Sequence, residues 1–569
     1  MSKFSRDRVK GFLHTDGRRM VNGDGQTVVL RGWGVGNWLN PEGFMIGGPS
    51  FFGGADLASF STPRRYERGR SVDLVIRELC GSAFVEEYQK KWIENYFNET
   101  DIKLMAELGY NSVRLPLDSR LFLDEEPGIH WNEENFKVLD RVLDWCEAHK
   151  IYAILDRHAA PGGQSALPCD DGVDNRPHTF TEPESRERTM LIWEEIAKRY
   201  CDRWIVGGYD LLNEPLSGPG NLYLMPELAR FYTEVIERIR KYDKDHMFTL
   251  EGAIFSMDLD IFEQDYDPEC HNWCIHTHFY GFSPEIRDLY RFLEMSQRCN
   301  VPIWIGEGGS DATSNTIFYE IAGAFDMGFA LWSWKSAALG GMVQERPLAH
   351  RLPAGWEQVQ KYCSDGGPRP SYLEAQKIFR EMLELIKTEN CTLDRISSIY
   401  ALRQPGITLP AVGFDETEGS FHGNGWRLGN TYCYRTETGM KMVRKPGTLP
   451  AQRLIMPSKE PEIRHTLAID ELCLELNENE FVSYTIRDVE SEIPLNLTGR
   501  TLPCKDCQLT ILVQPEGSSS YTKVMTLSAS ESVSTDINDM QLIQILPTSE
   551  AVIRITVEKG TLQLDSIKF

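Results

Sequence analysis

The sequence predicts an α/β fold, a (β/α)8 TIM barrel, followed by an all-β sandwich domain. Up to about residue 390, short β-rich runs alternate with longer amphipathic stretches, which is typical of βα units around a parallel sheet. From about residue 391 the helical periodicity largely disappears, and short alternating runs with turn residues follow. We therefore expect the barrel at 1–390, a linker or bridging segment at 391–410, and the sandwich at 411–569.

Eight β-rich runs set the architecture of the first part. The segments between them have helical periodicity; in 132–150, Phe136, Leu139 and Leu143 fall on one face with charges opposite. A strand and a crossover helix repeated eight times predicts a closed barrel, since open doubly wound sheets more often stop at about five or six strands. The runs are residues 27–36, 111–117, 152–158, 206–214, 247–252, 272–280, 302–309 and 328–334.

Two insertions depart from minimal βα units: residues 41–95 after the first strand and 336–371 after the eighth. In this fold such insertions shape the active-site mouth. The first contains Phe51, Phe52 and Phe60, which we interpret as a hydrophobic anchor for the loop rather than as a lid over a ligand.

The bulk composition disfavours several classes of partner. With 84 acidic against 60 basic side chains the formal net charge is -24, which would repel nucleic acid and anionic lipid surfaces. No apolar run reaches the roughly 18 residues that span a bilayer, and the basic start lacks the apolar core of a signal peptide. We expect no nucleic-acid partner, no membrane insertion, reduced cysteines and a cytoplasmic location; the oligomeric state stays open.

Several predicted strands have an apolar body and end in a polar residue, which packing of the strand does not require. In a TIM barrel the functional groups lie at the carboxyl ends of the strands, so these residues should converge on one mouth. They are Arg114 on the second strand, Asp156 and His158 on the third, Asn213 and Glu214 on the fourth, His276, His278 and Tyr280 on the sixth, Glu307 on the seventh and Trp332 on the eighth.

Two of these residues, Glu214 and Glu307, favour a specific chemistry. Each follows an apolar run and should be partly desolvated, which is costly for a carboxylate unless its charge or proton is stabilised. A facing pair suits glycoside hydrolysis: one carboxyl with a raised pKa protonates the leaving oxygen, and the other, ionised, attacks the anomeric carbon or activates water. Sequence spacing does not give their separation, which distinguishes retaining from inverting enzymes.

Five motifs carry a family resemblance: RLP, NEP, HFY, GEGG and WSWK, in that order on the second, fourth, sixth, seventh and eighth strands. Together they resemble glycoside hydrolase family 5, in the clan of retaining TIM-barrel glycosidases, over roughly residues 20–390. LRGWGVGNWLNPEG and ILDRHAAPGGQ are similar to stretches of its exo-β-glucanase and β-glucosidase branch. The resemblance implies a carbohydrate substrate, hydrolysis of β-glucosides or short β-gluco-oligosaccharides, and no cofactor or metal.

The resemblance also implies roles. Glu214 would be the general acid/base and Glu307 the nucleophile, with Asn213 bonded to the sugar 2-hydroxyl. Arg114 would keep Glu307 ionised, and Tyr280 would donate to the same carboxylate.

Four further residues would surround the sugar or the acid/base. His278 would sit beside the acid/base, and His158 would bind sugar hydroxyls. Trp332 would form the floor under the reacting ring. Glu42 would grip the hydroxyls of a non-reducing terminal sugar, which is the basis for expecting exo action.

Some features depart from the branch or leave alternatives open. Arg157 stands where the branch has Leu; by strand alternation it points away from the His158 face, which favours a structural role. Gly308 and Gly309 replace an aromatic residue after the nucleophile. The alternatives are an endo-acting glucanase, a glycosidase of glycolipids or other large aglycones, a metal-dependent hydrolase that uses the HxH pair, and an inactive carbohydrate-binding protein.

The predicted sandwich is similar to carbohydrate-binding modules of families 6 and 35, through NTYCYRTETGMKM, FVSYTIRDV and GTLQLDSIKF. In that group an aromatic pair clamps a sugar, and Trp426, Tyr432 and Tyr434 are the candidates here. Phe481 stands where the group often has Trp. A sandwich that packs on the barrel and shapes its mouth is the favoured alternative.

Overall fold

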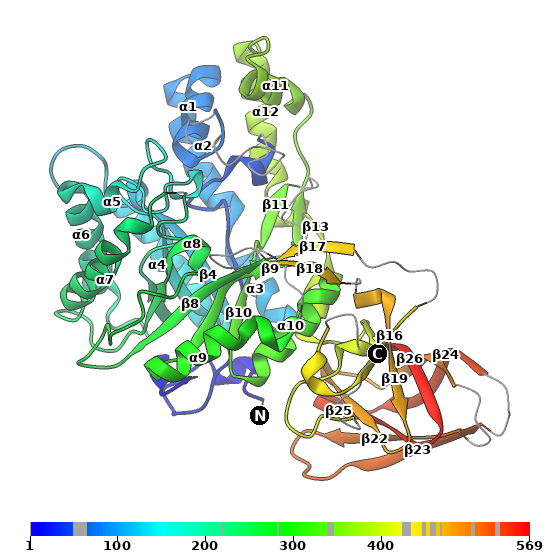
Figure 1. The fold of residues 1–569 in the computed structure, drawn as a ribbon. Coiled ribbons are helices and arrows are strands. Elements are labelled where there is room, and N and C mark those ends of the chain that lie inside the picture. Colours follow the sequence, from blue (N-terminus) through cyan, green and yellow to red (C-terminus); the bar gives the residue numbers. More distant parts are fainter. Residues whose placement is uncertain are drawn as a thin grey trace.

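The computed structural model consists of a barrel with helical insertions and a β-sandwich beside it (Figure 1). It describes residues 2–48, 65–218, 220–280, 284–337, 346–423, 434–445, 451–455, 462–466, 469–501, 507–529 and 535–569. Within these residues, no helix is both long enough and apolar enough to cross a membrane.

The eight predicted strands form a closed parallel barrel in the order β10-β3-β4-β5-β6-β7-β8-β9. Their side chains are buried almost throughout, because helices cover the outside while the lumen is filled from within. The fold class predicted from the sequence is therefore confirmed. The strands are β3 Arg31–Gly34, β4 Ser112–Asp118, β5 Tyr152–Ala159, β6 Val206–Asp210, β7 Phe248–Glu251, β8 Trp273–Tyr280, β9 Ile303–Gly309 and β10 Gly328–Trp332.

Helices connect these strands and bury one face against the barrel. Phe136, Leu139 and Leu143 are buried on α4, as the periodicity predicts. Asn98 caps the start of α3 and Gly109, at φ 101°, ends it. The helices are α3 Glu99–Leu108, α4 Glu133–His149, α5 His178–Thr181, α6 Pro183–Tyr200, α7 Met225–Ile239, α8 Ala253–Ser256, α9 Tyr290–Cys299 and α10 Ala312–Ala324; a hairpin of β1 His14–Asp16 and β2 Arg19–Val21 precedes the barrel.

The two predicted insertions fold together above one end of the barrel (Figure 1). Tyr88 of α2 packs edge-on against Phe379 of α12, with ring centroids 5.6 Å apart. Residues 49–64, which include Phe51, Phe52 and Phe60, lie outside the described part of the chain. The elements are α1 Gly69–Cys80 and α2 Ser82–Tyr96 after β3, and β11 Lys335–Ala337, β12 Leu348–His350, α11 Trp356–Asp365 and α12 Tyr372–Leu385 after β10.

The described C-terminal part has two large antiparallel sheets, β16-β19-β26-β21-β24 and β15-β20-β25-β22-β23, and a separate antiparallel pair, β17-β18. Within the segment expected as a linker or bridging strand, α13 (Arg395–Leu402) follows β13 (Thr392–Leu393), and β14 (Thr408–Pro410) pairs with β26. The other strands are β15 Phe421–His422, β16 Lys441–Arg444, β17 Ala451–Ile455, β18 Glu462–Thr466, β19 Leu472–Asn477, β20 Phe481–Val489, β21 Ile493–Thr501, β22 Cys507–Pro515, β23 Thr522–Ala529, β24 Thr535–Ile545, β25 Thr548–Lys559 and β26 Thr561–Lys568.

Buried ion pairs join the sandwich to the barrel. Arg487 of β20 makes two hydrogen bonds to the carboxylate of Glu320 on α10, at 2.6 and 2.8 Å. Arg403, just after α13, bonds Asp415 at 2.9 Å and donates to the backbone carbonyl of Thr316 on α10 at 3.2 Å. Because a charge buried without its partner is costly, these pairs hold the two domains in one arrangement.

Candidate active site

Arg114 of β4 lies at the centre of a buried polar cluster at the carboxyl ends of the barrel strands. Its side chain is fully buried, so its charge depends on the carboxylates around it. The guanidinium lies 2.7 Å from Oδ1 of Asn213, 2.8 Å from Glu307, 2.9 Å from Asp210, 3.1 Å from Asp156 and 3.3 Å from Glu251. The strands thus bring together residues that lie far apart in the sequence.

Glu307, near the end of β9, is held as a carboxylate. Arg114 donates to Oε2 at 2.8 Å, the hydroxyl of Tyr280 donates to Oε1 at 2.7 Å, and Nδ1 of His278 lies 3.8 Å away. Burial by itself would raise the pKa of Glu307, but the charges of His278 and Arg114 outweigh burial and lower it. Glu307 is therefore ionised near neutral pH.

Glu214 follows β6 in a backbone conformation that non-glycine residues rarely adopt, at φ 44°. Its backbone N–H donates to Oε2 of Glu251 at 2.7 Å, and Nδ1 of His278 lies 2.9 Å from its Oε1. The thiol of Cys169 lies 3.8 Å from the other carboxylate oxygen. Burial raises the pKa of Glu214, against the opposing effect of His278, so this carboxyl holds its proton to higher pH than an ordinary glutamate.

The two carboxyl groups face one another across His278. One oxygen of Glu214, one oxygen of Glu307 and one ring nitrogen of His278 all lie within 4.8 Å of one another. The pKa of the first is raised and that of the second is lowered. Neighbouring carboxyls with pKa values pushed apart can act as a proton donor and an anion at the same pH.

Trp332 and His158 form one wall of the site. Their rings are parallel, at an interplanar angle of 2°, with centroids 5.3 Å apart. A Cβ at Gly34 or Gly36 would lie 2.6 or 2.7 Å from the Trp332 ring, so the glycines of RGWGVG leave the space that the indole fills. An indole ring can stack on the apolar face of a pyranose.

Polar groups flank this wall. His158 bonds Asp156 through Nδ1 at 2.7 Å, while its Nε2 lies 3.9 Å from Glu42. Burial is the main cause that raises the pKa of Glu42 to about 8. Since Oδ1 of Asn213 is bound to Arg114, its amide N–H groups are the ones available to a ligand hydroxyl.

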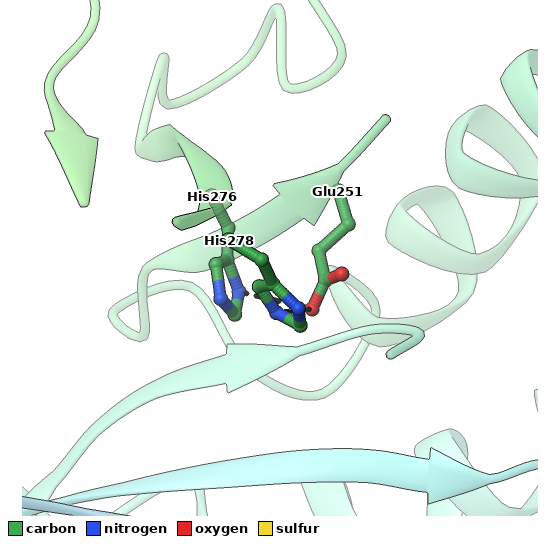
Figure 2. Close-up of side chains that lie close together, drawn as sticks. All are labelled: Glu251, His276 and His278. Atoms are coloured by element: carbon green, nitrogen blue, oxygen red, sulfur yellow. Dashed lines mark ion pairs between the residues drawn. The ribbon is translucent and has the colours of Figure 1, made fainter. Parts of the chain in front are cut away.

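Glu251, His276 and His278 lie close enough together to consider as metal ligands (Figure 2). The oxygen of Glu251 that faces them also lies 3.3 Å from Arg114, and Nδ1 of His276 bonds Asp210 at 3.0 Å. A divalent cation at this point would face the guanidinium charge at short range. The contacts are accounted for by the ion-pair network around Arg114.

Residues 78–338 match the family model described as Cellulase (glycosyl hydrolase family 5). The barrel strands from β4 to β10 thus match glycosyl hydrolase family 5. A beta-xylosidase of Phanerodontia chrysosporium is 32% identical over 251 residues, which are 44% of this chain and 48% of that protein. A glucan 1,3-beta-glucosidase of Lachancea kluyveri is 28% identical over 228 residues, 39% of this chain and 48% of its own. The chain thus spans about half the length of the curated relatives that it matches.

Solved structures match the chain as well. A crystal structure of an endogalactoceramidase aligns with 98% of this chain and 100% of its own, at 14% identity and a TM-score of 0.45. A rutinosidase from Aspergillus niger aligns with 55% of this chain and 92% of its own, at 14% identity and a TM-score of 0.44.

Two charged residues of the site are not among those that the sequence predicts. Asp210 and Glu251 both contact Arg114, and Glu251 also contacts the backbone of Glu214. Glu251 ends the apolar strand MFTLE, so the signal that identified Glu307 was present for it too. Asp210 lies inside an apolar run, and nothing in its local sequence distinguishes it from a structural residue.

Two residues flagged in the sequence lie outside the site. Arg157 points to the helix layer, with its guanidinium 5.0 Å from the ring of Trp193, in line with the structural role expected for it. Tyr434 does not serve as a sugar clamp: it is buried against the barrel, and its hydroxyl donates to the carbonyl of Pro284 at 3.3 Å. Trp426 and Tyr432 fall outside the described residues.

Proposed function

We propose that the protein is a retaining β-glycosidase that removes a terminal β-glucosyl unit from β-glucosides or short β-gluco-oligosaccharides. The observation that carries the proposal is the pair Glu214 and Glu307, with oxygens within 4.8 Å and pKa values shifted in opposite directions. Retaining glycosidases keep their carboxyl groups about 5–5.5 Å apart, whereas inverting enzymes leave roughly 6.5–9.5 Å for a water molecule.

In the first step Glu307 attacks the anomeric carbon while Glu214 gives its proton to the leaving oxygen. The C–O bond to the aglycone breaks, and an ester forms between the sugar and Oε1 or Oε2 of Glu307. In the second step Glu214, now a carboxylate, takes a proton from water, which attacks the same carbon and releases Glu307. Tyr280 and Arg114 stabilise the carboxylate of Glu307 when it leaves.

Glu42 supports exo action. Its carboxyl is buried beside His158, at the edge of the wall that Trp332 forms. A group there can hydrogen-bond the outer hydroxyls of the ring and close the site beyond it. The sugar in the reacting position is then the last of its chain, which favours terminal β-glucosides over internal linkages.

The pH dependence follows from the two shifts. Catalysis requires Glu307 ionised and Glu214 protonated. The rate constant kcat/KM should rise as pH passes the lowered pKa of Glu307, and it should fall as pH passes the raised pKa of Glu214. A bell-shaped profile results, with its maximum between the two values.

A substrate screen with product analysis tests the proposal. Nitrophenyl glycosides of several sugars, defined β-gluco-oligosaccharides and glucosylated lipids cover both the proposed substrates and the alternatives of endo action and a large aglycone. Proton NMR of the first-formed product should show the β-anomer of glucose, released from the non-reducing end. A first-formed α-anomer would exclude retention, and internal cleavage products would exclude exo action.

A further inference from the structure

Glu251, the last residue of β7, contacts several groups of the site but takes no part in the reaction steps proposed above. Its side chain is fully buried. Oε2 accepts the backbone N–H of Glu214 at 2.7 Å. Oε1 lies 3.3 Å from Nε2 of His278 and 3.2 Å from Nδ1 of His276 (Figure 2). The same oxygen lies 3.3 Å from Nη2 of Arg114. Both oxygens therefore engage groups that touch the two central carboxyls.

The contact to Glu214 acts on a strained backbone. Glu214 has φ 44°, a backbone conformation that residues with a Cβ rarely adopt. The surrounding structure must stabilise this conformation. A hydrogen bond from an amide to a buried carboxylate is a strong one. Glu251 thus fixes the peptide from which the carboxyl of Glu214 is directed towards Glu307.

The second contact of Glu251 is to His278, whose Nε2 lies 3.3 Å from Oε1 at ion-pair distance. A carboxylate only accepts, so it favours a hydrogen on the ring nitrogen that faces it. Nδ1 of the same ring lies 2.9 Å from Oε1 of Glu214. The ring of His278 therefore contacts Glu251 through one nitrogen and the carboxyl of Glu214 through the other.

We propose that Glu251 is the positioning residue of the general acid/base, orienting Glu214 through its backbone N–H and holding the proton on Nε2 of His278. The proposal rests on the assignment of Glu214 as the acid/base. The charged or titratable groups that face Glu251 are Arg114, His276 and His278; Asp210 bonds Arg114 and His276 from the other side.

The test compares two leaving groups in Glu251→Gln. The amide keeps the shape but loses the negative charge and one acceptor. For 2,4-dinitrophenyl β-glucoside, whose leaving group needs no proton, kcat/KM should change less than about 5-fold; for an alkyl β-glucoside it should fall about 100-fold. The high-pH limb for the alkyl substrate should move to lower pH, because the negative charge of Glu251 helps to raise the pKa of Glu214.

Tyr232→Phe is the matched control. The hydroxyl of Tyr232 donates to the backbone carbonyl of Glu251 at 2.8 Å, so this variant removes a buried contact of the same residue and leaves its carboxylate intact. Any loss in Tyr232→Phe should be equal for the two substrates. Equal losses in Glu251→Gln would overturn the proposal and make Glu251 a structural residue.

Two further measurements distinguish a folding defect of the variant from a failure of the proposed function. If Glu251→Gln does not fold, Glu251→Asp repeats the comparison; failure of both to fold beside a folded Tyr232→Phe would also overturn the proposal. A wild-type protein that cleaves neither glucoside would instead refute the proposed function. Circular dichroism and the melting temperature report folding in each case.

Discussion

Two regions of the molecule bury clusters of arginine and carboxylate, and they differ in how the charges are matched. At the boundary between barrel and sandwich, Arg487 faces Glu320 and Glu550, and Arg403 faces Asp415. At the barrel mouth, one guanidinium, that of Arg114, contacts four carboxylates: Asp156, Asp210, Glu251 and Glu307. Both regions are buried, so burial alone does not separate a structural cluster from a functional one.

The balance of charge separates them. Burial would raise the pKa of Glu320, but Arg487 dominates and lowers it to about 2, so this pair keeps its charges throughout the neutral range. At the mouth, two pKa values lie closer to neutral pH. Burial alone would lower the pKa of His158, but pairing with Asp156 outweighs burial and raises it to about 9; burial is the main cause that raises the pKa of Glu42 to about 8. Groups with such pKa values can gain or lose a proton near neutral pH, as general acid/base catalysis requires.

The largest expected effect belongs to Glu307. Glu307→Gln keeps the volume and the hydrogen bond to Tyr280 but removes the attacking anion, so kcat on the preferred glucoside should fall by several orders of magnitude. Thermal unfolding should change little, because Arg114 keeps three other carboxylates. A variant with more than a tenth of wild-type kcat would refute the role of Glu307.

Glu42 should show a smaller effect that depends on the substrate. Glu42→Ala removes hydrogen bonds to a terminal sugar and should lower kcat/KM for terminal glucosides about 10- to 100-fold. Glu42→Gln should lose less, since with a pKa of about 8 the native carboxyl is largely protonated at neutral pH. Equal losses for terminal and internal linkages, measured on defined oligosaccharides, would contradict exo action.

Arg487→Met should change stability and leave kcat within about 2-fold. It strips Glu320 of a buried partner, and breaking one side of a buried pair costs about 3–5 kcal/mol. Arg199→Met is the control: its partners Glu133 and Glu195 lie nearer the surface, where a pair contributes about 0–1 kcal/mol. Urea unfolding measures the stability of both variants. A fall in kcat without a fall in stability would contradict this prediction and indicate that the interface affects catalysis.

The smallest expected effect is that of chelation. Dialysis against EDTA should leave activity unchanged, because Arg114 already supplies the positive charge beside Glu251. An activity that EDTA abolishes and Zn²⁺ restores would revive the interpretation of His276 and His278 as metal ligands.

The barrel could be predicted from sequence because its strands are near-continuous apolar runs with polar residues at their ends. The polar residues at the strand ends also predicted that Arg114, Asn213, Glu214 and Glu307 are neighbours. It could not give their distances, which depend on the closure of the barrel between β10 and β3.

Other features depended on packing that local sequence does not encode. Helix α13 lies in the segment expected as a linker; Asp394 caps it, and its placement depends on packing against α10. Tyr434 was a candidate for sugar binding because it is aromatic, yet the contact with Pro284 buries it. Arg157 was placed correctly because alternation along a strand is a local property.

Trapping with a 2-deoxy-2-fluoro-β-glucoside bearing a good leaving group tests the central claim most directly. The fluorine slows both steps, and the activated leaving group lets the covalent intermediate accumulate. Intact mass should increase by one fluoroglucosyl unit, and peptide mapping should place it on Glu307, with no label in Glu307→Gln. A label on Glu214 or elsewhere, or rapid turnover of wild-type substrate with no trapped intermediate, would contradict the account.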